Sequence, residues 1–67
     1  MSNLEEQLTK VRKLQSRATT AKMELYYLAE GLPINWTKVK TAGRKTFNAF
    51  AELEAAKEEL ATLENSQ

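Results

Sequence analysis

The chain has 67 residues, with 10 Lys and Arg against nine Asp and Glu, and it contains no Cys and no His. Chains this short rarely bury enough apolar surface to be stable alone, and they rely on disulfides, a structural metal or oligomerisation. The missing Cys and His exclude disulfides, remove the best zinc ligands and exclude the usual nucleophile and base pairs. We therefore expect a single non-enzymatic domain over residues 1–67 that binds no cofactor, oligomerises and, having no Cys, is cytoplasmic.

The first predicted element is a helix over about residues 3–30. Ser2 with Glu5, or Asn3 with Glu6, has the spacing of a capping box at its start. Beyond this point apolar residues recur at alternating steps of three and four, which is the a and d pattern of a heptad repeat. The a positions hold Leu4, Val11, Ala18, Leu25 and Leu32, and the d positions hold Gln7, Leu14, Ala21 and Leu28.

A turn is predicted over about residues 31–35. Gly31 is expected to take a positive φ just past the helix end, and Pro33 prevents the helix from continuing. Asn35 is expected to cap the next helix with its side-chain oxygen. The apolar side chains of the turn are expected to pack as a small plug, formed by Leu32, Ile34 and Trp36.

A second helix is predicted over about residues 36–64, and its heptad positions continue to the end of the chain. Two helices of roughly 42 Å, at 1.5 Å per residue, joined by a short turn must run antiparallel, so the predicted fold is an all-α helical hairpin. In this hairpin residue i lies level with residue 67 − i. Two helices leave one side of each seam exposed to solvent. We therefore expect two hairpins to form a four-helix bundle, so that the chain is a dimer or a tetramer. The second seam is Val39, Ala42, Thr46, Ala49, Leu53, Ala56, Leu60 and Leu63.

Charge is distributed in two complementary blocks. Between Gln7 and Met23 the charged residues are all basic, whereas five Glu and one Lys lie between Glu52 and Glu64. The blocks favour the antiparallel pairing of the two helices. As an alternative, a basic face could contact an RNA backbone, although a net charge of +1 is low for a nucleic-acid partner. The residues of that face are Lys10, Arg12, Lys13 and Arg17.

Two further features have both a structural and a functional interpretation. Glu54 and Glu58 share a helix face and could contribute to a metal site, but a Glu run opposite a basic helix is typically an ion-paired, solvated face. The five aromatic residues lie in the half of the hairpin nearest the turn and off the seam. They either widen the core or form an interface with another copy or another protein. These residues are Tyr26, Tyr27, Trp36, Phe47 and Phe50.

Membrane insertion is not expected, because the apolar runs are far shorter than the roughly 20 residues that a bilayer span requires.

Two stretches carry a family resemblance, KLQSRATTAKMELYYLAEGLPINW at residues 13–36 and KVKTAGRKTFNAFAEL at residues 38–53. They resemble a small Rop-like family of unknown function found beside nitrogen-fixation genes in cyanobacteria and other diazotrophs. The resemblance implies an oligomeric helical hairpin, a role in nitrogenase maturation or regulation, and a protein partner from that system. It implies no catalytic activity. Where the family has His-Asp, this chain has Tyr26 and Tyr27, which puts a metal-binding role of those positions in doubt.

The sequence therefore predicts a helical scaffold or adaptor that acts through oligomerisation and protein contacts. The alternatives are an RNA-binding regulator, whose hairpin shape resembles that of the plasmid protein Rop, and a metal-carrying accessory protein.

Overall fold

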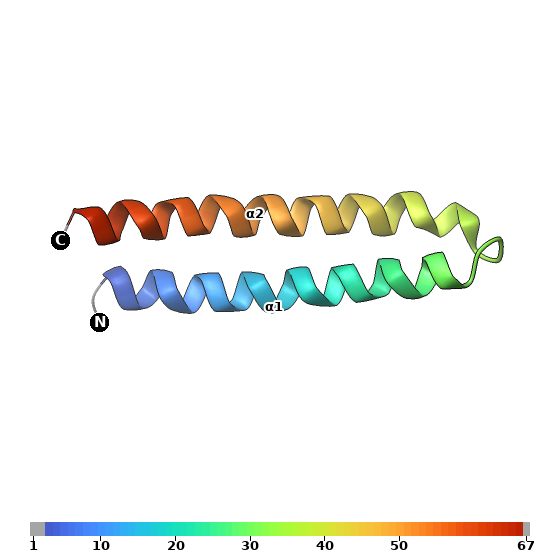
Figure 1. The fold of residues 1–67 in the computed structure, drawn as a ribbon, viewed down its shortest axis with the longest axis horizontal. Helices are drawn as coiled ribbons and strands as arrows, with labels where there is room; N and C mark the ends of the chain where they lie inside the picture. The colour runs from blue at the N-terminus through green and yellow to red at the C-terminus, as the bar shows by residue number, and fades with distance from the viewer. Residues whose placement is uncertain (1–2, 67) are drawn as a thin grey trace.

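The computed structural model describes residues 3–66 and shows two long helices folded back on one another (Figure 1). Helix α1 spans Asn3–Glu30, the 3-10 helix η1 spans Trp36–Lys38, and α2 spans Val39–Asn65. The turn lies at one end of a rod of 51 × 15 × 13 Å, and the start of α1 and the end of α2 lie at the other (Figure 1). The predicted all-α antiparallel hairpin is confirmed. Ser2, one of the two expected capping residues, lies outside the described residues.

The heptad seam is the part of each helix that is removed from solvent. In α1 the a and d residues from Leu4 to Leu28 are all buried or half-buried, and every other described residue of the helix is exposed. In α2 the same holds for the seam from Val39 to Leu63, with Gly43 as the one additional half-buried residue. The 3.6-residue period of the helix therefore fixed which side chains meet.

The core enclosed by the two seams is small. The buried cluster consists of two larger side chains, Val11 and Leu53, and otherwise of alanines. Alanine lets two helix backbones approach closely, but each buried alanine removes little apolar surface from water. The hairpin alone therefore has a thin core, which favours a further layer of packing. The alanines of the cluster are Ala18, Ala21, Ala49 and Ala56, and Leu14 and Leu60 pack against it.

Two polar seam residues connect the helices across their contact. Near the chain ends, Gln7 Nε2 donates to the carbonyl oxygen of Ala56 at 3.0 Å and lies 3.2 Å from Glu59 Oε2. Nearer the turn, the Thr46 hydroxyl lies 3.1 Å from the carbonyl oxygen of Ala21 on the opposite helix. These contacts pair residues whose numbers add to about 67, so the expected level of the two helices is confirmed, and polar groups at fixed seam positions specify that register.

The turn differs from the prediction in its backbone conformation. Gly31 does not take a positive φ: its N–H still donates to the carbonyl oxygens of Tyr27 and Leu28, both at 3.2 Å, as a residue at a helix end does. The positive φ belongs to Asn35, at φ 62° and ψ 26°. Asparagine tolerates this left-handed region better than other residues with a side chain. The Leu32–Pro33 peptide bond is cis.

Two other expectations for the turn were wrong. Asn35 makes no side-chain capping hydrogen bond, because a capping residue needs an extended backbone and Asn35 is left-handed. Its carbonyl oxygen instead accepts from the N–H of Lys38 at 2.9 Å. The apolar plug is also absent from the turn, since its three members are exposed to solvent. Leu32, Ile34 and Trp36 are 48%, 71% and 68% exposed.

Candidate interaction surfaces

The flat hairpin has two broad faces, and one of them is charged. We call it the charged face and define it by the g and c positions that flank the d residues. Two ion pairs cross it, Lys10 Nζ to Glu59 Oε2 at 3.7 Å and Arg17 Nη1 to Glu52 Oε2 at 3.8 Å. Their side chains are more than half exposed, so each pair contributes no more than about 1 kcal/mol to the stability of the hairpin. The predicted pairing of the charge blocks is therefore observed.

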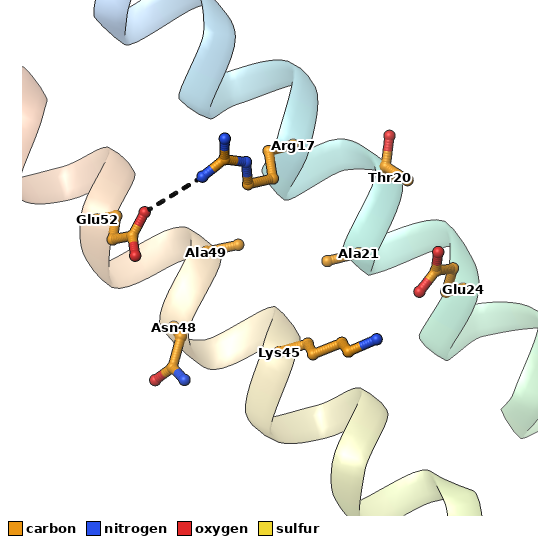
Figure 2. Close-up of a pocket in the computed structure, with 8 residues that line it drawn as sticks. All are labelled: Arg17, Thr20, Ala21, Glu24, Lys45, Asn48, Ala49 and Glu52. Atoms are coloured by element: carbon orange, nitrogen blue, oxygen red, sulfur yellow. Dashed lines mark ion pairs between the residues drawn. The ribbon is translucent and has the colours of Figure 1, made fainter.

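A shallow groove runs along the charged face. One part of it, about 320 Å³, has Ala21 and Ala49 as the floor, and Figure 2 shows Arg17 and Glu52 at one end joined by their ion pair. Lys45 and Glu24 extend from opposite helices farther along the groove (Figure 2). Two further hollows lined by both helices continue it in both directions, and a third lies beside it on α1. Small floor residues beneath long charged side chains produce a groove of this kind.

The structure brings together only part of the basic set predicted for RNA contact. Lys10, Lys13 and Arg17 line one hollow on the charged face. Arg12 occupies a b position and is not among the residues that line that hollow. Two of the three grouped cations already face a glutamate across the groove. The geometry thus provides no continuous basic surface of the four residues.

The opposite face is apolar in its turn half, and we call it the apolar face, defined by the e and b positions beside the a residues. Phe50 and Trp36 fall at e positions, and Tyr26 and Phe47 at b positions. They are exposed by 40%, 68%, 54% and 73%, respectively. Leu8, an e residue at the other end, is 36% exposed. This face has no partner within the hairpin.

The aromatic residues predicted as one patch are divided between the two faces. Tyr27, 66% exposed, occupies a c position and belongs to the charged face, whereas Phe47 belongs to the apolar face. Among residues 3–66 the aromatic contact is between Tyr26 and Tyr27, whose ring centroids lie 5.8 Å apart with an edge-on angle of 71°. The proposed patch therefore reduces to Tyr26, Trp36, Phe47 and Phe50 on one face.

Sequence reasoning missed the contrast between the e and g positions, which was available without a structure. Every g position from Lys10 to Glu24 and from Lys38 to Glu59 carries a charged side chain. In the turn half, the e positions carry one charge, at Lys22. The charged g residues keep one face hydrated, and the mostly uncharged e residues make the other face suited to an interface. Interfaces are depleted of charged residues at their centre.

No cluster of three or more His, Cys, Asp or Glu side chains suited to a metal ion occurs within residues 3–66. Within the same residues, neither α1 nor α2 contains a stretch long and apolar enough to cross a membrane.

A family model described as Rop-like matches residues 2–65 of the chain. The chain belongs to the Rop-like family. A family member from Sinorhizobium fredii, UPF0437 protein y4xE, is 57% identical over 67 residues, and the alignment covers both chains in full. UPF0437 protein asl1434 of Nostoc is 38% identical over 66 residues, covering 98% of this chain and 93% of the relative.

A third relative is described by the position of its gene. It is the UPF0437 protein in the nifX-nifW intergenic region of Frankia alni, 45% identical over 58 residues, which cover 87% of this chain and 70% of the relative. No solved structure gives a significant match to the chain.

Proposed function

We propose that this chain is a non-enzymatic helical scaffold of nitrogen fixation, acting by assembling with itself and by contacting another protein of the nitrogenase production pathway. The observation that carries the proposal is the pairing of a thin alanine core with exposed aromatic side chains on one face. Trp36 and Phe47 are 68% and 73% exposed, and exposed apolar side chains gathered on one face support a contact with another protein surface.

The connection with nitrogen fixation comes from a relative. The Frankia alni family member is encoded between nifX and nifW, genes named for nitrogen fixation, and it shares 45% of 58 aligned residues with this chain. Neighbouring bacterial genes are often expressed together, so a small protein encoded there is suited to act on the products of the same system. The helices of this chain offer two exposed faces for binding, one charged and one apolar.

A gene deletion tests the proposal. In a nitrogen-fixing host that carries this gene, deletion should lower nitrogenase activity under nitrogen-fixing growth. The wild-type gene should restore activity, and a Phe47→Ser variant, which removes an exposed aromatic ring from the contact face, should restore it less. Undiminished nitrogenase activity in the deletion strain, measured under several nitrogen-limited conditions, would overturn the role in nitrogen fixation.

A further inference from the structure

We propose that the apolar face is covered by a second copy of this chain, packed face to face with both turns at the same end. In this two-fold arrangement α1 of one copy lies against α2 of the other. The inference rests on the self-assembly contained in the proposed function and specifies its interface and orientation. It concerns the e and b positions, and it leaves the charged face of each copy accessible.

Area favours a contact along the whole hairpin. The rod is 51 Å long and 15 Å wide, so one whole side of it presents an area of the order of the roughly 800 Å² per partner found in specific protein interfaces. A contact restricted to the turn halves would cover about half of that area, which is less than the interface of a stable dimer requires. A second copy that overlaps along the full length therefore fits the surface that the hairpin leaves open.

The distribution of charge along the face selects the orientation. The half near the chain ends is strongly charged, whereas the turn half carries only Lys22 and Lys40 beside its aromatic rings. An opposite orientation would place the rings of one copy over the charges of the other, and covering charges with apolar groups is costly. When the two turns lie at the same end, the aromatic half of one copy covers the aromatic half of the other, and the charged half covers the charged half. The charged residues of the end half are Glu5, Arg12, Glu54, Lys57 and Glu64.

One pair of opposite charges matches across the proposed interface, whereas Glu5 comes nearly level with Glu64 of the second copy as a like-charged pair at the chain ends. With α1 against α2, Arg12 of one copy comes level with Glu54 of the second copy, because residues i and 67 − i share a level in the hairpin. Each such opposite pair occurs twice in a two-fold dimer. The turns would also lie at the same end, which brings the exposed Leu32 and Ile34 of the two copies near one another.

Gly43 is a second and independent observation on this face. A glycine inside a helix costs about 1 kcal/mol relative to alanine, and apart from its chain neighbours and the nearby backbone of α2 no atom of the hairpin lies within 4 Å of the position that a Cβ would take. The hairpin itself therefore does not require glycine here. In the turns-together arrangement, Tyr26 of the second copy comes nearly level with Gly43, and the missing side chain makes room for its ring.

Spin labels at the turn end test this orientation, using the full chain, which contains no native Cys. Glu30→Cys places an exposed label near the turn, on the side of α1 away from both contacts. With turns together, the two labels of a dimer lie at one level, less than about 30 Å apart given helix axes about 10 Å apart. The opposite orientation separates them by about 39 Å along the rod at 1.5 Å per residue.

Ser16→Cys is the matched control, because it is exposed, lies on the same side of α1 and sits near the middle of the hairpin. Its two labels should be less than about 30 Å apart in either orientation, given the same spacing of helix axes. Short distances at both positions support the proposal. A short distance at residue 16 with a long one at residue 30 overturns the orientation and leaves the scaffold role standing. No distance between copies at either position overturns the self-assembly itself.

Discussion

Replacing Phe47 by Ser should weaken assembly of the hairpin far more than replacing Tyr27 by Ser. Both side chains are aromatic and similarly exposed, 73% and 66%, so neither removal takes much from the core of a single hairpin. They differ in the face they occupy, since Phe47 belongs to the apolar face and Tyr27 to the charged face. The pair therefore separates loss of an interface contact from loss of an exposed ring in general.

The size of the effect follows from the exposed area. An aromatic side chain can bury about 200 Å², so the exposed part of Phe47 is about 150 Å², and covering half of it contributes about 2 kcal/mol at ~25 cal/mol per Å². A two-fold dimer contains two such rings, and losing about 4 kcal/mol raises the dissociation constant by about three orders of magnitude. Tyr27→Ser should change it by less than about threefold, because surface changes away from contacts stay within ~0.5 kcal/mol.

Sedimentation equilibrium over a dilution series measures both dissociation constants, and far-ultraviolet circular dichroism at the same concentrations checks that both variants stay helical. Equal weakening by the two substitutions would refute the assignment of the apolar face as the contact. Loss of helicity in Phe47→Ser at concentrations where the wild-type monomer is folded would place that ring in the hairpin core instead.

Three further predictions concern packing and charge. Ala18→Leu, at a position with no exposed surface, should lower the free energy of unfolding of the hairpin by about 1–3 kcal/mol, measured in urea. Ala51→Leu, on the exposed side of α2, should change that free energy by no more than about 0.5 kcal/mol. Equal effects of the two substitutions would contradict the close approach of the helices. Gly43→Ala should raise hairpin stability by about 0.5–1 kcal/mol at concentrations where the chain is monomeric and weaken dimerisation in the dilution series. Tighter dimerisation of Gly43→Ala would contradict the proposed contact. Glu52→Gln should cost no more than about 1 kcal/mol at low salt, and the difference from wild type should shrink at 1 M salt, where charges are screened beyond ~3 Å.

The hairpin could be predicted because the spacing of apolar residues along each helix is periodic, and this spacing can be read from short stretches of sequence. Alternating steps of three and four from Leu4 to Leu28 and from Val39 to Leu63 place the same side chains in contact that the structure buries. The level of the two helices could also be predicted from their equal lengths and short turn, and the pairs of Gln7 with Ala56 and of Thr46 with Ala21 confirm it.

The turn could not be predicted in the same detail, because several residues there can supply the needed backbone conformation. Gly31 and Asn35 both tolerate positive φ, and only the three-dimensional path of the chain assigned it to Asn35. Nearness to the turn and a position off the seam group the five aromatic residues, but these two criteria do not separate the two faces of the hairpin. The e position of Phe50 places it on the apolar face, opposite the charged g positions. In the same way, the c position of Tyr27 and the b position of Phe47 place these two residues on different faces.

The central claim is that the hairpin assembles through its apolar face, and the molar mass in solution tests it most directly. Light scattering over a range of protein concentrations should give one discrete species at twice the 7.6 kDa mass of the chain, fully helical, because the exposed aromatic rings of the apolar face are covered in the dimer. A helical monomer that keeps the mass of one chain up to high protein concentration would contradict the account.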